Sequence, residues 1–197
     1  MVMDITYKIT FYDYWHCGSG LSAGADVDLL VIKDKNKFPF VPGKTMKGLV
    51  REALNDILCF QGKELDLLNL LFGKENVKAS ENKTDSTTNQ GCLFFKNAEL
   101  DENIRKEIIA SQTADYLYEA ISSTAIGPDG VAKGHSLRRM EVAVPCELYG
   151  EILDVPEANE EEIACALKYI KRLGQNRNRG LGRCDISIVE TKKGGQS

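Results

Sequence analysis

The chain has 197 residues, of which 43% are hydrophobic and 27% are charged, as in an ordinary folded domain. The formal net charge of −4 excludes a strongly basic coat, but a local basic track could still bind nucleic acid. No apolar run approaches the roughly 20 residues of a membrane span, so we expect a cytoplasmic protein that contacts no membrane.

The cysteine and histidine content argues against a zinc protein. Six cysteines are widely scattered without a CxxC pair, whereas zinc ribbons and fingers need closely spaced ligands. With only two histidines, His16 and His135, a metallohydrolase is disfavoured as well. We expect the cysteines to be reduced and to act as small buried apolar residues.

The first half of the chain predicts one long strand, two helices and several loops. Residues 4–15 are rich in β-branched and aromatic types, which indicates a strand, and a small-residue loop follows at 16–25. Asp26 and Asp28 then precede an apolar run. The next patterns predict, in chain order, a short strand at 38–41, a helix from Pro42 to about residue 59, a helix at 63–73, a polar mobile loop at 74–90 and a strand at 91–98.

The second half predicts a β-rich excursion, a helix and a final strand. In chain order, we expect a short helix at 101–111, a β-rich segment at 115–155 with a hairpin tip at 126–134, an amphipathic helix at 160–173, a strand at 184–189 and frayed terminal residues. Strand, helix, strand thus occurs twice, which indicates the split βαβ of a ferredoxin-like or RRM-like α+β domain. We expect a single domain over residues 1–197, with a β-hairpin inserted at about 115–145.

Two segments of the chain are rich in basic residues. Lys44, Lys47 and Arg51 share one face of the predicted helix, whose amino-terminal end suits an anionic partner. Residues 172–183 combine three glycines with four arginines and carry no acidic residue, which suits close approach to phosphates. A solvated surface explains the loop as well as a phosphate site does, and it explains the helix face better.

Three stretches together resemble the RAMP superfamily of CRISPR proteins. Residues 40–51 resemble its Pro-Gly-x-x-x-Lys-Gly-x-x-Arg signature, and residues 175–183 resemble its C-terminal glycine-rich loop. Residues 126–145 resemble the thumb-like hairpin of the repeated backbone subunit in type III (Csm/Cmr) effector complexes. The resemblance covers most of the chain apart from the polar loop, and it implies a RAMP domain with a thumb insertion.

The resemblance also implies partners and a reaction. Such subunits stack as several copies along a guide RNA, beside other effector subunits, and cut the paired target RNA with Mg²⁺ or another divalent cation. Asp28 matches the cutting carboxylate and would hold the metal ion, with Asp26 as its neighbour. From the residue pattern alone, both aspartates are more simply turn formers ahead of a strand, and the resemblance favours a catalytic role for Asp28.

By the same resemblance, the basic elements and the hairpin face RNA. Such contacts hold the RNA backbone, while base pairing between guide and target reads the sequence. An apolar wedge such as Val131, Leu137 or Met140 would displace one nucleotide. The expected RNA-binding residues are Lys44, Lys47, Arg51, Lys133, Arg138, Arg139, Arg177, Arg179, Gly180 and Arg183.

Three alternatives remain open at this point. The chain could be a scaffold that binds guide RNA without cutting, in which case Asp28 is dispensable. It could be a guide-processing endonuclease, for which a histidine such as His16 would matter, although such enzymes are not expected to carry the signature at 42–51. It could also be a cytosolic module whose arginine loop binds an acidic protein, and co-purifying RNA would exclude that reading.

Overall fold

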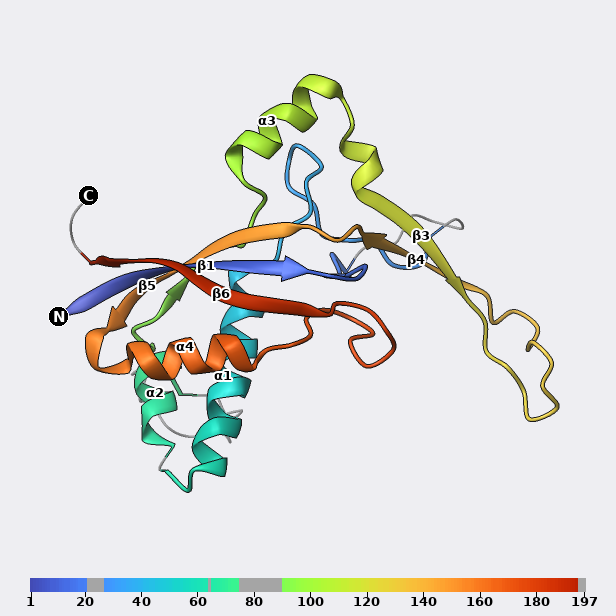
Figure 1. The fold of residues 1–197 in the computed structure, drawn as a ribbon. Helices are drawn as coiled ribbons and strands as arrows, with labels where there is room; N and C mark the ends of the chain where they lie inside the picture. The colour runs from blue at the N-terminus through green and yellow to red at the C-terminus, as the bar shows by residue number, and fades with distance from the viewer. Residues whose placement is uncertain (21–26, 64, 75–89, 195–197) are drawn as a thin grey trace, which may run out of the picture.

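The computed structural model of the chain describes residues 1–20, 27–63, 65–74 and 90–194 (Figure 1). Asp26 and most of the polar loop expected at 74–90 lie outside the described residues. The elements are β1 (Val2–Phe11), α1 (Gly43–Phe60), α2 (Asp66–Phe72), β2 (Phe94–Phe95), α3 (Glu102–Ser111), β3 (Tyr118–Ser123), β4 (Arg138–Ala143), β5 (Glu147–Pro156), α4 (Glu160–Tyr169) and β6 (Cys184–Lys193). None of the helices in the described ranges has the length and apolarity needed to cross a membrane.

Four strands form an antiparallel sheet in the order β2-β5-β1-β6. Helix α1 connects β1 to β2, and helix α4 connects β5 to β6. Each of these two βαβ units therefore holds a strand of the other unit between its own two strands. This is the ferredoxin-like arrangement, so the predicted fold class is confirmed.

The hydrophobic core lies between the sheet and the helices α1 and α4, which Figure 1 shows on the same side of the sheet. Along β1, buried Ile5, Tyr7 and Ile9 alternate with partly exposed residues, as expected for a sheet covered on one face. The fully buried side chains that complete this core include Met46, Val50 and Leu54 of α1, Leu148 and Ile152 of β5, and Ile163 and Leu167 of α4.

Helix α1 begins at a glycine that the fold requires. The N–H of Gly43 donates to Oδ1 of Asn97 at 3.0 Å, which satisfies one of the free donors at the helix start. A Cβ atom at Gly43 would overlap the carbonyl group of Phe95, so the β2 segment can lie this close only to a glycine.

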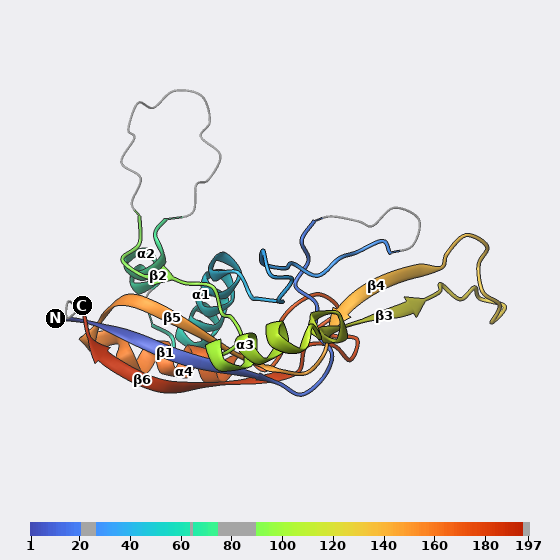
Figure 2. The same cartoon turned by 90° about the horizontal axis from the view of Figure 1, so that it is seen from above.

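Strands β3 and β4 form a separate two-stranded sheet, which projects from the body as a hairpin (Figure 2). An isolated hairpin of this size is marginally stable, so the contacts at its base matter. Trp15 and Ala143 exchange two backbone hydrogen bonds of 3.1 and 2.8 Å, and the indole N–H of Trp15 donates to the carbonyl of Val144 at 3.1 Å. Trp15 is fully buried and stacks on Phe11, so the hairpin is attached to the core.

Several predicted element boundaries are wrong. The first strand ends at Phe11 rather than at residue 15, because residues 12–15 turn towards the base of the hairpin. The strand predicted at 38–41 is reduced to isolated bridges, one of which joins Val41 to Ala98. The strand predicted at 91–98 is a strand only at Phe94–Phe95.

The last helix and the last strand also differ from prediction. The helix predicted to reach residue 173 ends at Tyr169, and Ile170 is already extended. This change of direction buries Leu173 completely, and its N–H donates to the carbonyl of Gly182 at 2.9 Å. Strand β6 runs to Lys193 rather than to residue 189, because it continues to pair with β1 as far as Met3.

The expectation that all six cysteines are buried is wrong. Cys17 and Cys184 are buried, and burial raises the pKa of each thiol to about 12. Cys59, Cys92 and Cys165 are exposed. A cysteine is small enough to fit a helix surface as readily as a core, so its residue type does not predict its burial.

Candidate nucleic-acid interface

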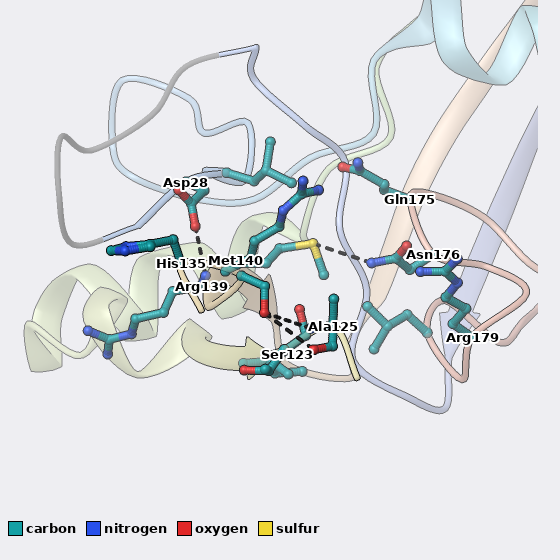
Figure 3. A pocket seen from close by; sticks show the side chains of 15 residues that line it. Asp28, Ser123, Ala125, His135, Arg139, Met140, Gln175, Asn176 and Arg179 are labelled. Atoms are coloured by element: carbon teal, nitrogen blue, oxygen red, sulfur yellow. Dashed lines mark hydrogen bonds between the residues drawn. The ribbon is translucent and has the colours of Figure 1, made fainter. Parts of the chain in front are cut away.

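A groove opens where the hairpin meets the glycine-rich loop (Figure 3). Its volume is about 650 Å³, and three segments that lie far apart in sequence line it. They are Asp28 with Leu29, the hairpin residues between Ile121 and Met140, and the loop residues between Gln175 and Leu181. The candidate carboxylate, the hairpin and the glycine-rich loop therefore share one surface.

Asp28 is exposed at this surface but is held firmly by strand β4. Its N–H donates to the carbonyl of Arg139 at 2.9 Å, and its Oδ2 accepts from the N–H of Arg139 at 2.8 Å. The next residue, Leu29, bridges Met140 in parallel, and its carbonyl accepts from the N–H of Glu141 at 3.0 Å. The segment after residue 26 thus lies along β4 like an additional strand, which fixes the position of the Asp28 carboxylate.

The hairpin supplies two of the expected cations to the groove. Arg138 and Arg139 are exposed and line it, and Figure 3 shows Arg139 and His135 on the same side of the groove as Asp28. Lys133 is exposed in the turn between β3 and β4, where its N–H donates to the carbonyl of Ala125 at 2.9 Å. Lys133 is not among the residues that line the groove.

The glycine-rich loop supplies the opposite wall. Gln175, Asn176 and Arg179 line the groove from this side, and Figure 3 shows them across from Asp28. The amide of Asn176 approaches the sulfur of Met140 at 3.8 Å, which links the loop to β4. Arg179 is exposed and is the loop arginine that faces the groove. Gln175 and Asn176 were not among the expected contacts, because the arginine pattern does not single out neighbouring amides.

The other expected cations of the loop point elsewhere. Arg177 pairs with Glu52 of α1 at 3.5 Å. Arg183 pairs with Asp13 at 3.4 Å, and its guanidinium lies 5.4 Å from the centre of the Tyr12 ring. Gly180 is exposed, with a positive φ, but it does not line the groove. The arginines of this loop therefore divide between the groove and partners within the protein.

The expected cations of α1 lie outside the groove. Lys44 is exposed, whereas Lys47 and Arg51 are half-buried. Arg51 lines a shallow depression between α1 and the segment around α2. The Arg177–Glu52 pair joins the glycine-rich loop to the same helix, so α1 and the loop are neighbours.

Among the described residues, the charge of the groove is positive. Three described arginines and one described aspartate line it, namely Arg138, Arg139, Arg179 and Asp28. Arginine forks at such a site suit phosphate oxygens, and a concave positive surface concentrates polyanions. The arrangement can therefore hold a nucleic-acid backbone against the fixed carboxylate of Asp28.

A metal ion at this site would need ligands beyond the described side chains. Within the described ranges, no three His, Cys, Asp or Glu residues gather closely enough to hold an ion. Magnesium is commonly bound by one or two carboxylates together with substrate phosphates and water. The Asp28 carboxylate is compatible with that mode of binding, in which a phosphate-bearing partner would supply the remaining ligands.

Comparison with known proteins agrees with this architecture. The family model described as the RAMP superfamily matches residues 8–185 of the chain. A chain of the cryo-EM structure of the type III-B Cmr-beta complex bound to cognate target RNA has a TM-score of 0.70 and 12% identity, over 94% of this chain and 96% of that chain. A chain of the apo state of that complex has a TM-score of 0.68 and 13% identity, over 95% and 97%. At such identities the likeness shows the fold, and no curated protein matches the sequence.

Proposed function

Because the chain belongs to the RAMP superfamily, we propose that it is a guide-RNA-binding backbone subunit of a type III CRISPR effector complex. Its partners would be guide RNA, target RNA, further copies of this chain and other effector subunits. The similarity to chains of a type III-B complex, which in one of the two structures is bound to target RNA, supports this assignment.

The observation that carries the proposal is the composition of the groove. Arg138 and Arg139 reach it from the hairpin, and Arg179 reaches it from the glycine-rich loop on the other side. Cations on both walls can hold two stretches of phosphate backbone at once, without reading the sequence. Guide and target would be read by base pairing with each other.

We propose further that the subunit cuts the paired target RNA and that Asp28 is the catalytic carboxylate. Its two hydrogen bonds to Arg139 orient it in advance, which is a requirement for positioning a reacting group. It would orient the 2′-hydroxyl, whose oxygen bonds to the adjacent phosphorus as the P–O5′ bond breaks, so that the 2′-proton is lost and the leaving 5′-oxygen takes a proton from solvent. The exposed arginines of β4, Arg138 and Arg139, line the same groove and would stabilise negative charge on the phosphate. A divalent cation held by Asp28 and the RNA phosphates would neutralise the charge that develops on the phosphate.

The test is cleavage of target RNA by the assembled complex in magnesium buffer, with wild type and Asp28→Asn. Asparagine can still accept from the N–H of Arg139 but carries no charge, so it separates catalysis from local folding. We expect RNA binding to persist and cutting to fall at least a hundredfold, the scale on which one positioned acid–base group acts. Asp115→Asn is the matched control, because Asp115 is 86% exposed and lies outside the groove.

A purely scaffolding subunit is the second candidate. One observation favours it: Oδ2 of Asp28 already accepts a structural hydrogen bond, which gives the residue a role without any reaction. In that case wild type and Asp28→Asn would both bind RNA and neither would cut. Guide processing by His16 is disfavoured, because His16 is 0% exposed and cannot reach RNA in this fold.

A further inference from the structure

His16 is the one hydrophilic side chain that is buried among the described residues. Burying an imidazole is unfavourable unless its nitrogens are hydrogen-bonded. Nδ1 lies 2.6 Å from the carbonyl oxygen of Glu141, whereas Nε2 has no partner within the described part of the chain. A carbonyl oxygen only accepts, so Nδ1 carries the hydrogen and donates it to β4.

The backbone of the same residue contacts the opposite wall of the groove. The carbonyl of His16 accepts from the N–H of Gln175 at 2.8 Å. The backbone of Gly174 approaches the backbone of His16 so closely here that a Cβ atom at Gly174 would lie 2.5 Å from that carbonyl oxygen. Gly174 also has a φ of +97°, which other residues rarely adopt. His16 therefore joins β4 to the glycine-rich loop through one residue.

The link continues from Glu141 to the candidate carboxylate. The N–H of Glu141 donates to the carbonyl of Leu29 at 3.0 Å, and its carboxylate accepts from the N–H of Val31 at 3.0 Å and from Lys33 at 2.8 Å. Residues 28–33 and His16 are thus attached to the same edge of β4 through the backbone groups of Glu141, while β3 pairs with the other edge. A shift of β4 relative to His16 would move Asp28 away from the loop that carries Arg179.

We infer that His16 is a positioning residue, which sets the distance between the Asp28 wall and the Arg179 wall of the groove. The expected effect of His16 on cleavage rests on the proposed function. The link from Glu141 through His16 to Gln175 does not depend on that function. His16 does not touch RNA, since it is fully buried, and it acts through the backbone of Glu141 and Gln175.

Two variants of His16, to asparagine and to glutamine, provide the test, because their side-chain amides place a nitrogen at different positions of the imidazole. In His16→Asn the amide nitrogen occupies the place of Nδ1 and can still donate to Glu141, whereas in His16→Gln it occupies the place of Nε2 and cannot. We would measure amide hydrogen exchange in the isolated chain by NMR. In His16→Gln, the amides of Asp28, Glu141 and Gln175 should exchange about tenfold faster, as expected for the loss of one hydrogen bond. In His16→Asn they should remain protected, and the amides of β1 should be unchanged in both variants.

Equal exchange in the two variants would overturn the inference, as would faster exchange throughout the chain, which indicates only general destabilisation. Cleavage by the assembled complex is the second readout. With saturating target RNA, the complex with His16→Gln should cut about tenfold more slowly than the wild type at unchanged RNA affinity. The complex with His16→Asn should cut at the wild-type rate. If even the wild type does not cut, the proposed reaction fails, while the exchange experiment still decides the role of His16.

Discussion

Asp28 and Arg139 are joined by two backbone-directed hydrogen bonds that run in opposite directions. The Asp28 N–H donates to the Arg139 carbonyl at 2.9 Å, and the Arg139 N–H donates to Oδ2 of Asp28 at 2.8 Å. The second bond uses the side chain of Asp28 in the place of a backbone carbonyl. The candidate catalytic group is therefore also part of the attachment between the 27–34 segment and the hairpin.

This double role predicts different stabilities for two variants at residue 28. Asp28→Ala removes the acceptor for the Arg139 N–H and should lower the free energy of unfolding by up to about 1 kcal/mol, because the bond is exposed to water. Asp28→Asn keeps an acceptor and should unfold like the wild type. Urea denaturation of the isolated chain measures both, and equal loss of stability would show that the charge rather than the acceptor matters.

Two arginines of the glycine-rich loop should differ in their contribution to RNA binding. Arg179 faces the groove, whereas Arg183 is engaged by Asp13 and the ring of Tyr12. Arg179→Ala should weaken RNA binding and reduce the slope of log affinity against log salt by about one, the effect of losing one phosphate contact. Arg183→Ala should change neither quantity appreciably. Titration of a labelled guide RNA at several salt concentrations distinguishes them, and a larger effect at Arg183 would place the RNA on another surface.

The core contains a hydroxyl group that should be unfavourable for stability. Tyr7 is fully buried, and its hydroxyl has no hydrogen-bond partner among the described residues. Burial also raises the pKa of this phenol, since no water stabilises the phenolate. Tyr7→Phe should therefore raise the free energy of unfolding by about 1 kcal/mol. Tyr118→Phe is the matched control and should lower it, because the Tyr118 hydroxyl donates to the Lys37 carbonyl at 2.7 Å.

The cysteines should react with thiol reagents in two separate groups. The thiolate is the reactive form, and burial raises the pKa of Cys17 and of Cys184 to about 12, so near pH 8 only about one in ten thousand of these thiols is ionised. Cys59 and Cys165 are exposed and should be alkylated first. Mass spectrometry of a time course with iodoacetamide assigns each site. Early modification of Cys17 would mean that the core opens readily.

The sequence predicts the ferredoxin-like domain because its strands and helices carry their own periodic patterns. It predicts less well where a segment depends on distant partners. Arg177 and Arg183 look alike in the arginine pattern, but Glu52 and Asp13 engage them from the first third of the chain. Local spacing contains no information about such pairs, so it could not identify Arg179 as the residue that faces the groove.

The role of His16 could not be predicted from the sequence either. From the sequence alone, His16 is expected to matter only as the histidine of a guide-processing endonuclease. Its burial and its bond to Glu141 follow from the packing of β4 against the turn after Trp15, and the two bonded residues lie 125 positions apart in the sequence. Such a role becomes visible only when the tertiary contacts are known.

The contact at the start of α1 bears on how this protein's relatives should be found. Gly43 lies within the Pro-Gly signature, and the carbonyl of Phe95 leaves no room for a side chain there. Selection for folding alone would retain this glycine, whatever the protein binds. A search that relies on the signature therefore recovers common ancestry, and activity has to be judged from the residues around Asp28 and Arg179.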